Sequence, residues 1–479
     1  MISKVLEDNL KTVMDLFHNS ADLVEFKFLT LIESKAALVY IDGLCNKNGM
    51  NDNIVKPLME SLVDENDIKN TISASENEYI YTMEEVIKAV TNGLVVLFHE
   101  NLDYGLSIDL IEFERRSVEQ SMSERVIRGP KEAFVEDINV NRTLIRRKIK
   151  NNNLVFEDYI FGNQTNTKLS IVYIDDIVNP EILKDLKKRL DKVELEFVLD
   201  AHYIDEVISD SPLSLIETTF NTEKPDVLAA KILEGRIGII CDGSPNTSIV
   251  PKFFIECLMS AEDYYLRPLY ASFLRFLRLL AFVTSVMLPG VYVALSTFHH
   301  EMLPTDLLVT MANQRAGVPL SAFFEAFIMI LFFEFLKESG LRLPQPIGQT
   351  VTIVGGLVIG QASVEAGVIS AVMIIVVGAS GITEFVNPSL REFIVIYRLI
   401  LLVLGGILGL FGVTCGSCVM IFHLVSLKPF GVPYLYPIAP FDKEGMKDFI
   451  IRTPLNRNKY RPKYISNKDN RRKNTDDVK

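Results

Sequence analysis

The chain has 479 residues, of which 48% are hydrophobic and 23% are charged, and its formal net charge is −12. A mean hydropathy of +0.22 indicates that apolar residues are concentrated in one part of the chain. With 26 glycines and 20 prolines, the composition excludes collagen and wholesale disorder. Five cysteines in this length exclude a small secreted module built on disulfides.

Charge divides the chain into three parts. Residues 1–270 carry 29 basic and 47 acidic side chains, residues 271–442 carry 8 and 9, and residues 443–479 carry 12 and 5. This pattern is typical of a soluble domain, a membrane domain and a basic cytoplasmic tail. The acidic first part argues against a nucleic-acid partner, which would require a basic face. Residues 1–30 lack the apolar segment of a secretory signal, so we expect amphipathic helices and a first part that stays in the cytoplasm.

The soluble part contains one unit twice. Residues 37–42 read ALVYID and residues 170–175 read SIVYID. Each predicts a buried strand, and each is followed by a helical pattern, at 53–63 and at 180–192.

Two later segments repeat the same order of elements. Residues 83–110 and 224–251 each predict a helix, a strand, a turn and a second strand. Gly93 and Gly235 end the two helices, where glycine adopts the left-handed conformation without steric cost. We therefore predict two related α/β subdomains.

Acidic residues follow the predicted strands, and their simplest role is turn capping rather than a metal or phosphate site. They are Asp42, Asp175, Asp176 and Asp242. The chain has no Walker loop, GxGxxG, GxSxG or HExxH, and its six histidines lack metal-ligand spacing. The sequence predicts no enzyme, no cofactor and no metal site, and leaves open a small ligand between the two lobes.

A basic linker joins the subdomains. Gly129-Pro130 interrupts it, and residues 132–150 predict a helix that ends in a cluster of basic side chains. Three interpretations remain open: a solvated helix face, a surface that lies on anionic lipid headgroups, or a contact with the acidic surfaces of neighbouring subunits.

The membrane part begins with residues 274–298, which are long and apolar enough to cross a bilayer. Arg267, Arg275 and Arg278 at its start are typical of a cytoplasmic entry. Pro289-Gly290 predicts a kink.

Residues 319–338 are apolar but contain Glu325 and Glu334. The two acids lie on opposite faces of a helix. The segment fits either a span within a bundle or an amphipathic helix at the interface.

Residues 350–386 are too long for one straight span, and their many small residues predict a broken or re-entrant element. Gln361 and Glu365 share a helix face, and an intramembrane carboxylate is a candidate functional group. In a symmetric oligomer Glu365 would repeat as a ring beside a pore, where acids favour cations. The candidate pore-lining residues are Val358, Gly360, Gln361 and Glu365, and Gly355 and Gly356 are candidates for helix packing.

Residues 393–426 predict one apolar helix with a stripe of glycines along one face, which is typical of close helix–helix contact. The stripe consists of Gly405, Gly409, Gly412 and Gly416. The basic end, residues 461–479, predicts disorder and a cytoplasmic location. With both termini inside, the number of crossings must be even, and we expect four, with six as the alternative.

The predicted architecture is thus an α/β soluble N-terminal domain of two related subdomains, followed by an all-α polytopic membrane domain. The expected extents are 1–115 for the first cytoplasmic subdomain with its N-terminal helices, 116–154 for the basic helical linker, 155–270 for the second subdomain, 271–427 for the transmembrane domain of about four spans plus an amphipathic or re-entrant segment, and 428–479 for the basic cytoplasmic tail.

Several long strings in the chain together resemble the A subunits of GerA-type spore germinant receptors. They are RVIRGPKEAFVEDINVNRTLIRRKI (125–149), TEKPDVLAAKILEGRIGIICDGSP (222–245), EDYYLRPLYASFLRFLR (262–278), FHHEMLPTDLL (298–308) and ESGLRLPQPIGQTVTIVGGLVIGQASVEAGVIS (338–370). The Glu-Arg-Pro-Asp of many members appears here with Lys224 in place of arginine, which keeps the charge.

This resemblance implies an integral protein of the spore inner membrane with both termini in the spore core. It implies a homo-oligomer, a transporter-like B subunit and a lipoprotein C subunit as partners, contact with membrane lipid, and a role in nutrient-triggered cation release. By analogy, the linker would bridge neighbouring protomers, with Arg128, Arg142, Arg146 and Arg147 as contact candidates.

Other interpretations remain open. A non-conducting scaffold, or an orphan paralogue similar to the stage V sporulation AF proteins, would share these strings. A secondary carrier would require inverted repeats in the membrane part, whereas the duplication lies in the soluble part.

Overall fold

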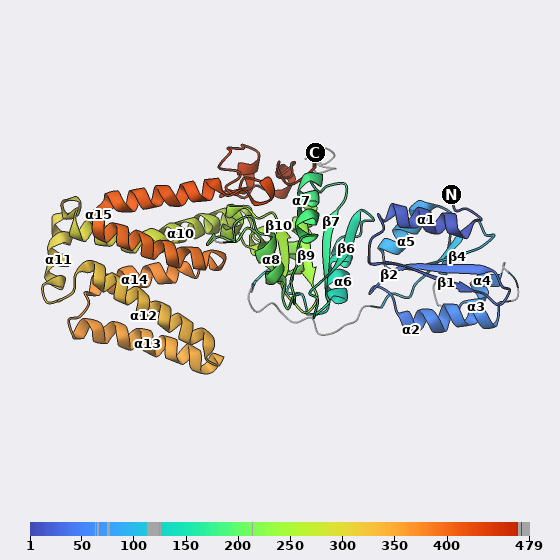
Figure 1. The fold of residues 1–479 in the computed structure, drawn as a ribbon, viewed down its shortest axis with the longest axis horizontal. Coiled ribbons are helices and arrows are strands. Elements are labelled where there is room, and N and C mark those ends of the chain that lie inside the picture. Colours follow the sequence, from blue (N-terminus) through green and yellow to red (C-terminus); the bar gives the residue numbers. More distant parts are fainter. Residues whose placement is uncertain are drawn as a thin grey trace.

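The computed structural model describes residues 1–62, 64, 67–73, 77–112, 124, 126–212, 214–467 and 471. It has three parts along its longest axis: a first α/β unit, a second α/β unit and a helical region (Figure 1). Part of the expected linker (116–123 and 125) and most of the end of the tail (468–470 and 472–479) lie outside the described residues.

The two α/β units contain sheets of the same topology, and every strand pairing in both sheets is antiparallel. The strand orders are β1-β2-β4-β5-β3 and β6-β7-β9-β10-β8. The predicted duplication is therefore confirmed at the level of topology. The strands are β1 (Leu23–Leu29), β2 (Lys35–Ile41), β3 (Asn77–Ile80), β4 (Val95–His99), β5 (Gly105–Ile108), β6 (Leu154–Phe161), β7 (Thr167–Ile174), β8 (Phe220–Thr222), β9 (Ile237–Cys241) and β10 (Thr247–Val250).

Helices cover both faces of each sheet, which explains why the central strands contain nearly continuous apolar runs rather than an apolar residue at every second position. In β7, Ile171 and Tyr173 pack toward α7 (Pro180–Leu190) and α8 (Ala201–Ile208). Val172 and Ile174 pack toward α6 (Ile138–Lys148) and α9 (Pro225–Leu233). Successive residues of a strand point to opposite faces, so one string fills two cores.

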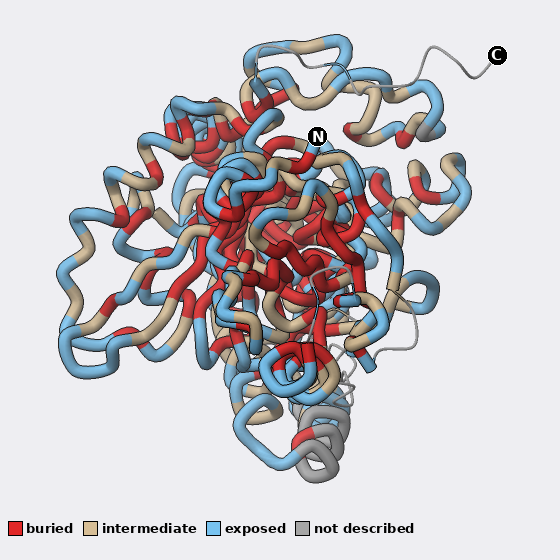
Figure 2. The backbone as a smooth tube through the Cα atoms, turned by 90° about the vertical axis from the view of Figure 1, so that its right-hand side faces the viewer, coloured by how far each residue is buried: buried red, intermediate tan, exposed pale blue. Residues whose placement is uncertain are grey.

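The first sheet has α1 (Leu6–Leu16) and α5 (Met83–Thr91) on one face, with α2 (Lys47–Met50) and α3 (Lys56–Glu60) on the other (Figure 1). A view from the end of this unit shows buried residues gathered in the strands at the centre (Figure 2). The helix predicted at 53–63 begins and ends earlier in the sequence, because helical turns run from Lys47 to Glu60. The Asn46 side chain accepts the Gly49 N–H at 2.7 Å and starts α2, and a π-helical turn precedes Pro57, which has no N–H to donate.

Gly93 and Gly235 occupy equivalent places after α5 and α9. Their φ angles are +92° and +105°, as the sequence predicts for glycines that end a helix.

The basic helix of the linker is shorter than predicted and belongs to the second sheet. It begins at Ile138, because Asp137 accepts the N–H groups of Asn139 and Val140 and caps the helix. Its apolar side, which includes Leu144 and Ile145, packs into the core against β7 and α9. α6 precedes β6 as α1 precedes β1, so the repeated unit starts with a helix.

The two α/β units meet at a buried ion pair. Arg146 on α6 donates to Asp22 through Nε at 2.8 Å and through Nη2 at 2.7 Å, and neither side chain is more than 3% exposed. Asp22 lies at the start of β1, and the neighbouring Ala21 N–H donates to the Phe156 carbonyl of β6 at 2.9 Å. The joint thus combines a charge pair with a backbone hydrogen bond.

The helical region begins with α10 (Pro268–Thr297) and continues through α11 (Thr305–Arg315), α12 (Ala322–Arg342), α13 (Gln345–Glu365) and α14 (Ala371–Glu384). α13 and α14 are separated at Gly367, whose φ is +63°. The segment predicted to be broken is therefore two helices joined by a short turn.

The last apolar helix was predicted to be continuous, and the structure shows that it is interrupted. α15 (Arg391–Ser426) is interrupted at Gly409, with φ of 63° and ψ of −148°, a conformation open to glycine alone among common residues. The two halves run back along each other (Figure 1). Accordingly, a Cβ on Gly412 would collide with the Leu404 carbonyl oxygen, eight residues away, and a Cβ on Gly416 would lie 2.6 Å from the Leu401 side chain.

The tail also differs from its prediction. Residues 461–467 return to the second α/β unit, where the Asn467 N–H donates to the Ile177 carbonyl at 2.7 Å and Ile465 is fully buried. The apolar residues Ile465 and Tyr464 explain this contact, and the basic composition around them concealed it.

The joint between the units gives the first prediction. Asp22→Asn leaves the Arg146 guanidinium buried without a carboxylate, and we expect it to lower the free energy of unfolding by about 3 kcal/mol. The control Glu7→Gln removes an exposed pair with Lys27 and should change little. Chemical denaturation of the full chain, followed by circular dichroism, makes the comparison, and equal stability of the two variants would contradict a structural role for the joint.

Candidate functional site

The candidate pore-lining residues lie on α13, which packs against α12. Its described residues from Gly355 to Glu365 are partly or fully exposed. Gln361 Nε2 donates to Glu365 Oε1 at 2.8 Å, so the structure brings the two predicted polar residues together on an exposed face. Val358 is 55% exposed. A Cβ on Gly360 would meet only the Ile374 side chain, at 3.9 Å.

The predicted packing glycines fall into two groups. On α13, Gly355 lies against the Leu336 side chain of α12, whereas a Cβ on Gly356 would meet no atom within 4 Å. On α15, Gly405 lies against Gly290 of α10, because a Cβ on Gly405 would be 2.5 Å from the Gly290 carbonyl oxygen. The helices α10 and α15 therefore cross with their backbones in contact, as small residues allow.

A buried carboxylate holds the turn between α13 and α14. Glu325 on α12 is fully buried and accepts both the backbone N–H and the hydroxyl of Ser370, at 2.9 and 2.8 Å. Its other oxygen lies 3.4 Å from Arg315 Nε. Ser370 is the N-cap of α14, so Glu325 is favourably placed at the positive end of that helix. The sequence singled out Glu325 but not this role.

Four charged residues form a cluster inside the bundle, here called the central charge cluster: Glu334, Lys337, Glu384 and Arg398. Arg398 Nη2 lies 2.5 Å from Glu384 Oε2, and Lys337 Nζ lies 2.7 Å from both Glu384 Oε1 and Glu334 Oε1. Arg398 Nε donates to the Ser285 carbonyl of α10 at 2.9 Å. These four residues have no net formal charge and connect α10, α12, α14 and α15. The partly exposed Arg391 adds a positive charge beside them, with its Nε 3.7 Å from Glu384 Oε1.

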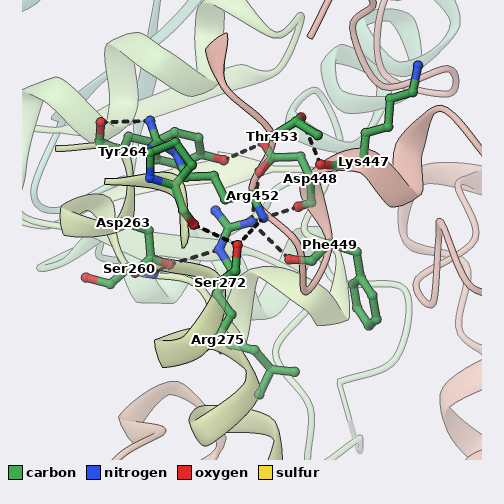
Figure 3. Close-up of polar contacts among 12 residues, drawn as sticks. Ser260, Asp263, Tyr264, Ser272, Arg275, Lys447, Asp448, Phe449, Arg452 and Thr453 are labelled. Carbon is green, nitrogen blue, oxygen red and sulfur yellow. Dashed lines mark hydrogen bonds and ion pairs between the residues drawn. The ribbon is translucent and has the colours of Figure 1, made fainter. Parts of the chain in front are cut away.

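A second set of ion pairs joins the helical region to the second α/β unit (Figure 3). Arg275 on α10 donates to Asp263 at 3.1 Å and to Asp448 at 2.8 Å, and Arg278 donates to the same Asp263 at 2.8 Å. Asp263 is fully buried. The start of α10, the segment before it and the chain around Asp448, here called the C-terminal segment, are thus held together.

Arg452 adds to this junction from the C-terminal segment. Its guanidinium donates to the Leu266 carbonyl at 2.6 Å and to the Tyr264 carbonyl at 3.0 Å. The Tyr264 hydroxyl in turn donates to Asp448 at 2.9 Å. Movement of the C-terminal segment would therefore disturb the first turns of α10.

The predicted contact arginines of the linker have different surroundings. Arg146 is buried in the joint with Asp22, and Arg142 is buried in a pair with Asp158. Arg128 and Arg147 are exposed. A contact between protomers stays a prediction, and the two exposed arginines are better placed for it than the two buried ones.

Within the described residues, no three His, Cys, Asp or Glu side chains come together as a metal site would require. Two helical stretches, Pro268–Thr297 and Pro388–Ser426, are long and apolar enough to cross a membrane. The site that the geometry offers is therefore a set of helices with internal ion pairs, together with the exposed pair of Gln361 and Glu365 on α13. The sequence contained the charged residues of the cluster, but no local spacing indicated that Arg398 and Lys337 share Glu384.

The sequence matches, over residues 11–464, the family model described as the Bacillus/Clostridium GerA spore germination protein. The chain belongs to this family. It is 36% identical over 486 residues to spore germination protein KA of Bacillus subtilis (strain 168), with 99% of this chain and 89% of that protein covered. It is also 36% identical over 460 residues to the uncharacterized membrane protein YfkQ of the same strain, covering 95% and 90%.

Among solved structures, the chain is similar to the crystal structure of the N-terminal domain of the A subunit of the Bacillus megaterium spore germinant receptor GerK3. The two are 26% identical, with a TM-score of 0.41, and 53% of this chain and 97% of that chain are covered. The predicted membership in the GerA family is confirmed by the family model and the curated relatives. Their names are those of spore germination proteins and a membrane protein.

The central charge cluster gives the second prediction. Glu384→Gln leaves Arg398 and Lys337 with Glu334 as the one remaining carboxylate of the cluster, and we expect the loss of about 3 kcal/mol or more that follows when one partner of a buried ion pair is removed. Glu338→Gln, which removes the exposed pair with Arg342, is the matched control. Thermal unfolding of the purified protein in detergent measures the difference, and a midpoint for Glu384→Gln equal to that of the control would refute the cluster's structural role.

The third prediction concerns pH. Burial raises the pKa of Asp205 on α8 from its ordinary value of 3.8 to about 6, although the Ser248 hydroxyl donates to it at 2.8 Å. Because the folded-state pKa is the higher one, protonation favours the folded state, and this contribution is lost as the pH rises through about 6. We expect Asp205→Asn to be more stable than the wild type at about pH 8, by about 3 kcal/mol, and to lose the advantage near pH 4. Unfolding at several pH values tests this, and parallel pH profiles would contradict it.

Proposed function

We propose that this chain is the A subunit of a spore germinant receptor in the spore inner membrane. It acts there as a homo-oligomer with a transporter-like B subunit and a lipoprotein C subunit, and it turns nutrient binding into the release of cations. Membership in the GerA family supports the receptor assignment. The observation that carries the conducting role is the exposed polar face of α13.

The lengths of the helices support a membrane location. α13 has 21 residues, or about 31 Å, and each half of α15 has a length of about 26 Å, close to the hydrocarbon thickness of about 30 Å. The reversal at Gly409 adds one crossing to the number that an unbroken α15 would give. α10, α12, α13 and the two halves of α15 then make five crossings. α14, with 14 residues or about 21 Å, makes a sixth only together with the turns that flank it, and six crossings leave both termini in the spore core.

The distribution of charge indicates which of these helices are structural and which one lines a path for ions. Within the bundle, the central charge cluster neutralises its own charges, so it offers no path for ions. α13 instead carries Gln361 and Glu365 on a face that this chain leaves uncovered. In a ring of protomers, one such helix from each would place the carboxylates around an axis, and a ring of carboxylates favours cations.

Loss of the chain in spores of the source organism tests the receptor role. Release of potassium and dipicolinate is followed against a panel of amino acids, sugars and salts. We expect the response to one nutrient to disappear while others persist. Normal release with every nutrient, in a strain that also lacks related genes, would overturn the receptor assignment.

The conducting role gives the fourth prediction. Glu365→Gln keeps the size of the side chain and its hydrogen bond with Gln361 but removes the charge, and we expect potassium release to slow about tenfold, as a ring of neutral residues attracts cations less. Glu338→Gln on α12 is the control and should release potassium normally. Immunoblots confirm equal amounts of receptor. An unchanged rate in Glu365→Gln would favour a scaffold that does not conduct.

A further inference from the structure

A hollow at the start of α10 has no role in the contacts described above. It lies between the linker at Ile127 and Arg128 and the first turns of α10, and its volume is about 480 Å³. This volume is within the range of small-molecule sites, about 300–1,000 Å³. Its other lining residues are Glu262, Leu266, Arg267, Tyr270 and Leu274.

Among the described residues, five arginines lie at this end of α10, and they divide into two groups. Arg275, Arg278 and Arg452 all donate to acceptors within the protein. Arg128 and Arg267 are exposed, and within the described part of the chain neither forms an ion pair. These two guanidiniums, which have no ion pair with any described residue, both line the hollow.

Glu262 holds one of these arginines in place rather than neutralising it. Its Oε1 accepts the backbone N–H of Arg128 at 3.1 Å, which fixes the linker beside α10. Gly129 packs against the Tyr265 ring, where a Cβ would lie 2.7 Å from the nearest ring carbon. The described residues of the lining include two arginines and one glutamate, so their net charge is positive.

The position of the hollow along α10 selects the kind of anion. α10 has 30 residues and a length of about 45 Å, about 15 Å more than the hydrocarbon of a bilayer. The pairs of Arg275 and Arg278 with Asp263 fix this surplus at the N-terminal end, because charged groups tied to the soluble unit stay outside the hydrocarbon. The first ten residues of α10 then lie at the depth of the lipid headgroups.

The outer face of α10 continues from the hollow as an apolar stripe. Leu269 is 87% exposed, and Tyr270 and Phe273 are each 55% exposed. Phe276 and Leu280 follow at helical spacing, each 51% exposed. A ligand with an anionic head and an apolar tail matches both the arginines and this stripe, and aromatic side chains such as Tyr270 are favoured at the interface.

We propose that the hollow binds the phosphate headgroup of an anionic phospholipid of the cytoplasmic leaflet, with Arg128 and Arg267 as donors and the acyl chains along α10. The proposal rests on the membrane location within the proposed function. A lipid at this place would contact the linker, the second α/β unit and the first turns of α10 together. It would thereby stabilise the junction through which the C-terminal segment and α10 are connected.

Lipid binding to the full-length protein tests the proposal. Detergent-solubilised, delipidated protein is titrated with phosphatidylglycerol or phosphatidylcholine, and bound lipid is counted by native mass spectrometry. We expect the wild type to prefer phosphatidylglycerol. Arg128→Gln/Arg267→Gln should bind it about 25-fold more weakly, at about fivefold for each arginine near a lipid surface, and lose the preference.

Two matched variants serve as controls. One tests whether loss of any two positive charges weakens lipid binding, and the other tests whether substitution at these two positions disturbs the fold. Lys184→Gln/Lys188→Gln removes two exposed positive charges from α7 and should bind like the wild type. Arg128→Lys/Arg267→Lys keeps the charge and should keep the preference. Equal binding by the Arg→Gln variant and the wild type, or no preference in the wild type, would overturn the proposal.

A change of oligomeric state in the Arg→Gln variant with unchanged lipid binding would also overturn it, since a second copy of the chain would then occupy the hollow. The assay measures binding and not conduction. Ion conduction without a lipid preference would refute only the lipid site. Binding of phosphatidylglycerol without ion conduction would refute only the conducting role.

Discussion

A guanidinium buried among apolar side chains must have a carboxylate partner, because the cost of removing its charge from water is otherwise several kcal/mol. Arg398 is fully buried in the helical region and meets this requirement through Glu384. The pair lies on two different helices, and Lys337 adds a third, so separation of these helices would expose unpaired charges to an apolar environment. The arrangement of the bundle depends on this constraint.

Buried ion pairs also connect the other parts of the molecule. Arg146 and Asp22 connect the two α/β units, and Arg275 and Asp263 connect the second unit to α10. Each pair is buried, so it specifies one relative position of the parts more strongly than apolar contact alone. The parts that would have to transmit a signal, from soluble units to helices, are thus joined at defined points. α13 stands apart, because it has an exposed polar face and few contacts beyond α12.

The sequence predicted the soluble part well, for reasons that are local. The strings ALVYID and SIVYID are apolar on both faces, and glycines end the helices of both units, so the strands and the duplication could be recognised. The interactions that fix the helical region are not local. Glu325 and Ser370 are 45 residues apart, and nothing near either one indicates the other. The reversal at Gly409 was hidden for another reason: a glycine within an apolar run suits close packing as well as a turn, and only its neighbours in space decide between the two.

Access to α13 during potassium release tests the central claim, that ions pass along this helix, most directly. Decoated spores with Val358→Cys are treated with a small cationic thiol reagent. Spores with Ile407→Cys, on the exposed face of α15, are the control, because both variants carry the same native cysteines and differ only in the position of the added one. The account predicts that the reagent stops nutrient-triggered potassium release in Val358→Cys spores alone. Release that continues in Val358→Cys spores after the cysteine has reacted, or that stops equally in Ile407→Cys spores, would contradict it.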